Sequence, residues 1–482
     1  MGKGLTFRPC GWCHPEVTGL MVAMHSTDSP FSRRRFMQTA TAAGAALMGG
    51  ELFGQEAGQR PAPCKDVTVL NPRNRVPVGL IVDDSTCLVN LNKFAIPQFD
   101  HVYAGQRKEY QRDWKSWPSE IPDAFVRKFG EWSAEHGVKG KYSIVPYPAC
   151  VGRLDRQIPG WSQKELQQSI ELVRTVMMPN WDIHPEMVTH TRVIDLQTGH
   201  PYEDFSTKFM ENWDWTTGRS ADEITAYMTY ALTILKNIGL PCEGVTTPGG
   251  FGNRARPQLA QASFESVRSV FKAEVPHYFR DLFDEGDKSV APIVQNARDL
   301  ASDDPKCVVS IIGCTGDWTG GWDNVEPEGV DKFITADLKS GRMVDVITRG
   351  DPAMMVCHWT GIFWNGEEKG FKIFQEVVKR LNARFDNLLW MKLSTLARYW
   401  AAKECTTVTK TNAGIQFHAP WACEDFTVEF SAPGGRTIKF ADKPLEEAKS
   451  LTGLKSGTWA RRDETRTIAC VNLPRGKSEL TF

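Results

Sequence analysis

The sequence predicts a mixed α/β fold in which parallel strands alternate with helices and close into a barrel, followed by an all-β module. Short apolar runs typical of buried parallel strands recur between residues 76 and 391, and stretches with helical apolar spacing separate them. About six or seven such repeats favour a closed barrel over an open sheet. From Cys405 onward, the pattern changes to short runs in which apolar and polar residues alternate.

Apolar runs predict the strands of the barrel. The first run, residues 76–82, is almost wholly apolar and ends at Asp83 and Asp84, as expected of a parallel strand that is buried on both faces. A second run, residues 139–147, ends among prolines. The further predicted strands are residues 186–193, 244–247, 307–312, 353–357 and 387–391.

Apolar residues at helical spacing predict the helices between these strands. Ser162 begins one of them, and Glu165 follows three positions later, which is the pattern of a capping box. Another has Asp222 and Glu223 in its first turn, where the helix dipole favours negative charge. The predicted helices are residues 121–136, 161–176, 220–238, 257–271, 328–348, 371–385 and 394–403.

The C-terminal part is typical of a small all-β module. Residues 426–430 and 437–440 alternate between apolar and polar side chains, and the Pro-Gly-Gly sequence at residues 433–435 predicts a turn between them. We therefore expect three segments. They are a leader with its tether over residues 1–62, a barrel over residues 63–403 and a β-sandwich-like module over residues 404–482.

The N-terminal segment carries an export signal. Residues 32–38 match the twin-arginine pattern and lead into a mildly apolar stretch of small residues at 39–48. That stretch is too short for a membrane helix, which needs about 20 apolar residues. We expect the twin-arginine export machinery to deliver the folded protein to the periplasm or the outside of the cell. The mature chain, cleaved between Gly50 and Pro63, is expected to have no membrane span.

Composition excludes some partners and suggests another. The formal net charge is −1, and neither nucleic acid nor an anionic membrane attracts such a chain. Two of the 12 cysteines precede the export signal and the others form no close pairs, so we expect few or no disulfides. The 16 tryptophans are numerous, and several fall in predicted loops. Aromatic faces stack on sugar rings, so the tryptophans fit a carbohydrate cleft, but packing in a large core would explain them as well. The loop tryptophans include Trp213, Trp215, Trp318, Trp322 and Trp359.

In parallel barrels, reactive groups gather at the carboxyl ends of the strands. Asp83 and Asp84 lie at such a position, where one acid could bind a metal and the other take a proton from water; a helix cap or solvated turn is the alternative. His190 and His358 also come late in apolar runs, although a lone histidine is often structural. The glycine-rich loop at residues 247–252 could present backbone N–H groups or be a plain turn.

Taken in order, these positions resemble the polysaccharide deacetylase family, metal-dependent enzymes that remove acetyl groups from N-acetylated sugars. Residues 81–84 resemble its first motif, and Glu186 with the His-Thr pair at 190–191 resembles its second. The resemblance covers residues 76–402 and implies a distorted (β/α) barrel of about seven strands. It further implies a divalent metal, expected to be zinc, held by Asp84 and His190, with Asp83 as base and His358 as acid.

Later motifs of that family match more loosely. They imply substrate contacts from Phe251, Asp317, Trp318 and Trp359. One position departs from the family pattern, because Ile194 stands where a second metal-binding histidine is usual. The adjacent Asp195 could supply an oxygen ligand instead, and the metal would otherwise be held differently, weakly or not at all.

These observations lead to one expected function and two alternatives. We expect an exported carbohydrate-active hydrolase that deacetylates an N- or O-acetylated polysaccharide or oligosaccharide. The first alternative is a non-catalytic glycan-binding protein on the same scaffold. The second is a glycosidase that uses two carboxylates, such as Asp83 and Asp317.

Overall fold

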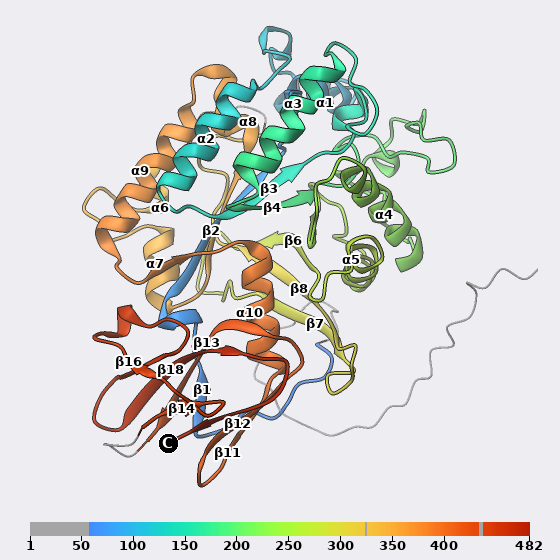
Figure 1. The fold of residues 1–482 in the computed structure, drawn as a ribbon. Coiled ribbons are helices and arrows are strands. Elements are labelled where there is room, and N and C mark those ends of the chain that lie inside the picture. Colours follow the sequence, from blue (N-terminus) through green and yellow to red (C-terminus); the bar gives the residue numbers. More distant parts are fainter. Residues whose placement is uncertain (1–56, 323–324, 433–436) are drawn as a thin grey trace, which may run out of the picture. The chain divides into compact units, whose positions relative to one another are not determined.

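The computed structural model describes residues 57–322, 325–432 and 437–482 (Figure 1). The predicted twin-arginine segment, most of its tether and the predicted turn at residues 433–435 lie outside the described residues. Residues 51–482 belong to one compact unit. Among the residues that the structure describes, no helix combines the length and the apolar character needed to cross a membrane. The ten cysteines from Cys64 to Cys470 are free thiols.

Seven parallel strands form the barrel (Figure 1). Pairing joins β9, β2, β3 and β4 in one sheet and β5, β6 and β8 in another. Two weaker joints close the ring: a bridge between Glu186 and Thr246, and a backbone hydrogen bond of 2.8 Å from Cys314 to Met354. The predicted barrel of about seven strands is therefore confirmed, and its distortion lies at these joints. The strands are β2 (Val76–Asp83), β3 (Gly140–Ile144), β4 (Trp181–Pro185), β5 (Gly244–Thr246), β6 (His277–Leu282), β8 (Lys306–Gly313) and β9 (Ala353–His358).

Two further strands extend the barrel sheets, and helices cover them. Strand β10 (Leu388–Trp390) pairs with the start of β2, and β7 (Ile293–Arg298) pairs antiparallel with β8. The helices are α1 (Leu91–Val102), α2 (Asp123–Glu135), α3 (Gln163–Leu172), α4 (Ala221–Asn237), α5 (Arg256–Phe271), α6 (Val330–Phe333), α7 (Arg342–Arg349), α8 (Trp359–Phe363), α9 (Lys369–Arg384) and α10 (Leu393–Cys405). The predicted capping box forms at Ser162 with Glu165, and a second one, which was not predicted, forms at Ser220 with Glu223.

The core explains why the strands read as continuous apolar runs. All eight residues of β2 are buried, because one face of the strand packs inside the ring and the other against helices. Aromatic side chains fill the layer between the ring and two of its helices. Phe129 of α2, for example, contacts Phe371 of α9 at a centroid distance of 5.5 Å and Trp181 of β4 at 5.4 Å.

The C-terminal residues form two sheets, which confirms the predicted all-β module (Figure 1). One sheet is wholly antiparallel and contains β11 (Thr407–Lys410), β12 (Gly414–Ala419), β19 (Gly476–Thr481), β14 (Lys439–Phe440) and β15 (Lys443–Pro444). The other contains β13 (Cys423–Ser431), β18 (Arg466–Leu473), β17 (Thr458–Arg461) and β16 (Glu446–Glu447). Its edge strand β1 (Val67–Val69) comes from the start of the described chain and pairs antiparallel with β13.

Several predicted elements are wrong. Residues 186–193 form a buried loop, and the strand before them is β4, whose polar Asp182 and His184 obscured it in the sequence. Both find distant partners, since Asp182 accepts hydrogen bonds from Ser394 and His184 lies 2.9 Å from His277. The predicted helix over residues 328–348 is two short helices, α6 and α7. Strands β6 and β7 and helix α1 were not predicted.

Candidate metal centre

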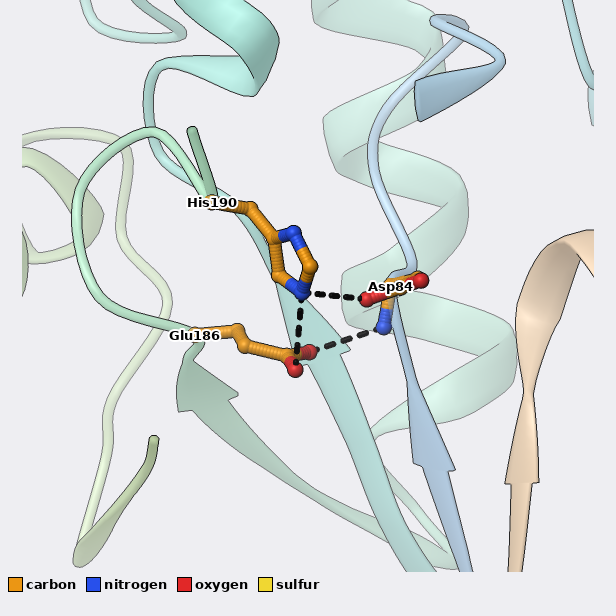
Figure 2. Close-up of side chains that lie close together, drawn as sticks. All are labelled: Asp84, Glu186 and His190. Carbon is orange, nitrogen blue, oxygen red and sulfur yellow. Dashed lines mark hydrogen bonds and ion pairs between the residues drawn. The ribbon is translucent and has the colours of Figure 1, made fainter. Parts of the chain in front are cut away.

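Three acidic and imidazole side chains meet at the carboxyl ends of β2 and β4 (Figure 2). Asp84 directly follows β2, and Glu186 and His190 lie in the loop after β4. Nε2 of His190 is 2.7 Å from Oδ1 of Asp84 and 3.4 Å from Oε1 of Glu186. All three residues are buried, and one ligand atom from each lies within 4.8 Å of the others. The structure thus brings together the two predicted metal ligands, Asp84 and His190, and adds Glu186.

The backbone at this site adopts an unusual conformation. Asp84, Met187 and His190 have φ angles of 62°, 50° and 62°, in the left-handed region that non-glycine residues seldom occupy. Residues held in this region cost free energy and persist only where surrounding contacts fix them. One such contact lies within the site itself, since the main-chain N–H of Asp84 donates to Oε2 of Glu186 at 2.7 Å.

A buried carboxylate, Glu211, fixes the loop that carries His190. Its two oxygens accept hydrogen bonds from the main-chain N–H groups of Val188, Thr189 and His190, the last at 2.6 Å. The Tyr227 hydroxyl donates to it as well, at 2.5 Å. Glu211 therefore holds three consecutive peptide groups of the loop in place. No local pattern predicts this role, because Glu211 lies in an irregular segment with no recognisable spacing to the loop.

Asn212 extends this support to the imidazole and to the glycine-rich loop. Its Nδ2 lies 3.4 Å from Nδ1 of His190. Gly249 and Gly250 pack on its main chain so closely that a Cβ atom at Gly249 would lie 2.7 Å from the Asn212 carbonyl oxygen. Gly249 also has a φ of 41°. The predicted glycine-rich loop thus has glycines because its backbone must approach Asn212.

The electrostatics of the cluster suit a cation. Burial alone would lower the pKa of His190, but the carboxylates of Asp84 and Glu186 hold it well above its usual value. Burial raises the pKa of Glu186, yet His190, Lys141 and the Asp84 amide bring it to about 2. Within the described part of the chain, neither oxygen of Asp84 has a hydrogen-bond partner, although both are buried. The two carboxylates and the imidazole together form a donor set that fits a divalent metal such as zinc.

Asp195 is not part of this cluster, which corrects the expectation that it might supply the third ligand. Its carboxylate accepts hydrogen bonds from the main chain of Gln197 and the hydroxyl of Thr198, within a local turn. Ile194, at the position where a second histidine was expected, is buried. The third candidate ligand is therefore Glu186, which is already in the predicted motif.

Asp83 forms a buried ion pair with Lys141 of β3, a residue that the sequence analysis missed. The Lys141 side chain is fully buried and also donates to the carbonyl oxygen of Val82 at 3.1 Å and to Oγ of Ser143 at 2.7 Å. Burial raises the pKa of Asp83 to about 6, even though the positive charges of Lys141 and His358 oppose the rise. Asp83 therefore titrates close to neutral pH, as a general base requires.

His358 ends β9 opposite Asp83 in the β2–β9 register. Its Nδ1 lies 2.6 Å from Oδ2 of Asp317. Burial lowers the pKa of His358, but the charges of Asp317, Asp84 and Asp83 outweigh it and raise the pKa to about 10. The imidazole is therefore protonated at neutral pH and can donate a proton from its other nitrogen. Asp317 acts on His358, and it does not line the cavity as predicted for a substrate contact.

A cavity of about 400 Å³ opens over these groups. Asp83, Glu186, His190 and His358 line it, which places the predicted base, acid and metal site at one mouth of the barrel. Its wall also carries five aromatic side chains and a guanidinium group: Phe99, Tyr110, Trp213, Phe279, Trp322 and Arg280. A larger hollow of about 990 Å³ lies at the amino ends of the strands and contains none of these groups.

Three of the predicted substrate contacts are corrected by their burial. Trp359 has no exposed surface and packs between Phe125 and Tyr142 in the core. Phe251 is fully buried against Trp215, and Trp318 packs on Phe333. None of the three lines the cavity. The aromatic wall comes instead from residues that the sequence did not single out, apart from the loop tryptophans Trp213 and Trp322.

The sequence matches no model of a known protein family and no curated protein sequence. Among solved structures, the chain is similar to a probable polysaccharide deacetylase from Pseudomonas aeruginosa PAO1, with 11% identity, 68% of this chain and 91% of that chain covered, and a TM-score of 0.38. It is also similar to Puue allantoinase, with 10% identity, 69% and 91% coverage and a TM-score of 0.37. A third similar structure is the glycoside hydrolase family 30 subfamily 8 xylanase Xyn30A from Clostridium acetobutylicum, with 9% identity, 86% and 98% coverage and a TM-score of 0.29.

Proposed function

We propose that this protein is a metal-dependent hydrolase that removes acetyl groups from an N- or O-acetylated carbohydrate. The observation that carries the proposal is the buried cluster of Asp84, Glu186 and His190, with Asp83 and His358 in the same cavity. These five groups supply a cation site, a base that titrates near neutral pH and a protonated acid, which together are the parts that hydrolysis of an acyl bond needs.

The chain's own residues have separate tasks in this mechanism. Asp84, Glu186 and His190 would hold the divalent ion, which we propose to be zinc. When bound, such an ion polarises a carbonyl oxygen and lowers the pKa of a bound water. Asp83 takes the proton from the attacking water, and Lys141 keeps its carboxylate in place. His358 gives its proton to the departing sugar nitrogen or oxygen, while Asp317 fixes the orientation of the imidazole.

Two further features support a carbohydrate substrate and an exported protein. The aromatic wall contains Trp213 and Trp322, which are partly exposed and whose rings could pack against sugar faces. The twin-arginine pattern at residues 32–38 supports export to the periplasm or beyond, where polysaccharides are found.

The proposal is tested by metal analysis of the purified protein together with acetate release from a panel of acetylated oligosaccharides. We expect about one divalent ion per chain and acetate release that an Asp83→Asn variant loses. A protein that neither binds metal nor releases acetate would overturn the proposal. If instead the Asp84→Ala variant binds polysaccharide as well as the wild type and neither form shows turnover, the protein is a glycan-binding module.

The structure weighs against a glycosidase that uses Asp83 and Asp317. Two carboxylates in such an enzyme must flank the scissile bond and face the substrate. Asp83 is paired with Lys141, and Asp317 is bound to His358 and does not line the cavity. The two acids thus serve as base and as partner of the acid histidine rather than as an opposed pair.

A further inference from the structure

Arg280 lies in the cavity wall because of an irregularity in β6. The pairing of β6 with β8 shifts register between Phe279 and Asp281, so Arg280 occupies a β-bulge. In a regular strand, neighbouring side chains point to opposite faces, yet both Phe279 and Arg280 line the cavity. Bulges often turn a side chain toward an active site in this way.

The guanidinium of Arg280 has no acidic partner among the residues that the structure describes. Its Nη2 donates to the side-chain oxygen of Asn253, and its Nε is buried without a hydrogen-bond partner. The nearest acid in sequence, Asp281, is occupied by Arg256, whose Nη1 lies 2.6 Å from both carboxylate oxygens. Burial and the positive charge of Arg256 lower the pKa of Arg280 to about 10, although the charge of Asp281 opposes this shift.

The other charges in the cavity balance one another. Lys141 offsets Asp83, and Asp317 offsets His358. The two carboxylates of the metal cluster face His190 and would face the metal. Within the described cavity, Arg280 is therefore the charged group that still lacks a counter-ion.

The order of the strands places Arg280 across the barrel mouth from the metal cluster. In the ring β2–β3–β4–β5–β6–β8–β9, strand β6 lies opposite β2, which carries Asp83 and Asp84. A substrate that has its acetyl group at the metal site and spans the mouth of the barrel would bring another substituent close to β6. A guanidinium presents its N–H groups as a planar fork that matches a carboxylate.

We propose that Arg280 binds a carboxylate of the substrate, so that the preferred substrate is an acetylated acidic sugar rather than a neutral one. This inference rests on the proposed deacetylation and adds the substrate class to it. It explains why an arginine with a buried Nε that has no hydrogen-bond partner lies in the wall of this cavity.

The test compares acids with their own methyl esters, because esterification removes the charge and keeps the skeleton. The probes are O-acetylated oligogalacturonate and N-acetylmuramic acid, each with its methyl ester. We expect the wild type to have a higher kcat/KM for the acid of at least one pair. Arg280→Gln should lower that value about 10- to 100-fold and leave the ester unchanged, and added salt should weaken the preference. Arg280→Lys keeps the positive charge without the planar fork, so its kcat/KM for the acid should lie between the values of the wild type and Arg280→Gln.

Arg268→Gln is the matched control, since it removes the same charge from an arginine of α5 that is paired with Asp304 and does not line the cavity. It should leave the preference for the acid intact. Equal turnover of acid and ester in both pairs, or an equal effect of Arg280→Gln on both, overturns the inference and leaves deacetylation standing.

Binding measured in the Asp83→Asn background separates the two proposals. If acids bind more tightly than esters through Arg280 but the wild type releases no acetate, the anion site stands and deacetylation fails. If acids and esters bind equally, the anion site fails whatever the turnover.

Discussion

Nε2 of His190 lies 2.7 Å from Oδ1 of Asp84, although the two side chains come from loops after different strands. Both carboxylate oxygens of Asp84 are buried, and the carboxylates of Asp84 and Glu186 raise the pKa of His190 well above its usual value. Two buried carboxylates next to one imidazole nitrogen require a positive charge between them. Either a proton on His190 or a metal ion can supply it, and the two compete.

The first prediction concerns metal content. Asp84→Asn removes one ligand charge, so we expect bound zinc, measured by mass spectrometry of the dialysed protein, to fall from about one ion per chain to near zero. Asp195→Asn is the matched control, because Asp195 accepts hydrogen bonds only within its own turn in the described chain. Equal metal loss in both variants would contradict the assignment of the site.

The second prediction is a bell-shaped dependence of kcat/KM on pH. Asp83 must be ionised to accept a proton, and its pKa of about 6 places the acid limb near that pH. His358 must be protonated to donate, and its pKa of about 10 places the alkaline limb there. Activity should thus rise through pH 6, form a plateau and fall near pH 10. A single limb, or limbs in the opposite sense, would show that these residues have other roles.

The third prediction concerns Lys141, whose positive charge lowers the pKa of Asp83 against the effect of burial. Lys141→Met keeps the length of the side chain and removes the charge, so the pKa of Asp83 should rise and the acid limb should move to higher pH. At pH 6 we expect kcat/KM to fall by about 10-fold or more. Ser143→Ala, which removes another partner of Lys141 but leaves the ion pair, should shift the limb much less.

How far the sequence predicted this molecule depends on where the deciding contacts lie. The apolar run of β2, the capping box at Ser162 and the acidic first turn of α4 are local patterns, and the elements that they predict are present. Strands β4 and β6 have polar residues whose partners come from elsewhere, as in the buried pair of His184 with His277. Such strands show neither a period-2 nor a continuous apolar pattern. The strand at β4 was therefore predicted at the wrong residues, and β6 was not predicted.

The candidate site was predictable to a similar extent. Strand ends single out Asp83, Asp84 and His358, because each directly follows or closes an apolar run. Lys141 and Arg280 could not be found in this way, since their roles depend on side chains across the barrel and on a bulge that no local pattern predicts. Trp359 was misjudged because its loop position in sequence says nothing about whether its ring turns inward.

The fourth prediction separates core tryptophans from cavity tryptophans. Trp359→Ala should lower the free energy of unfolding by about 3–5 kcal/mol, because it empties a fully buried site. Trp213→Ala should change stability less and instead raise KM, by roughly 10-fold, since its ring lines the cavity. Denaturant unfolding and steady-state kinetics on both variants provide the measurement. A rise in KM for Trp359→Ala at unchanged stability would restore it as a substrate contact.

The fifth prediction concerns Glu211, which is not a candidate metal ligand and does not line the cavity but holds the main chain of His190. Its carboxylate accepts hydrogen bonds from three peptide N–H groups and the Tyr227 hydroxyl. Glu211→Gln introduces an amide whose own N–H groups must face those donors, so the loop should lose at least one of its attachments. We expect the affinity for zinc to fall about 10- to 100-fold, as measured by chelator competition.

Tyr227→Phe is the graded comparison for Glu211→Gln, because it removes one donor and keeps the carboxylate and all three peptide contacts. Its effect on zinc affinity should be smaller than that of Glu211→Gln. A loop held mainly by its own packing would give a different result, with zinc affinity unchanged in both variants. In that case Asp84 and Glu186 alone would have to maintain the left-handed conformation of His190. Substitution of either residue should then disorder the loop, even in the protein without metal.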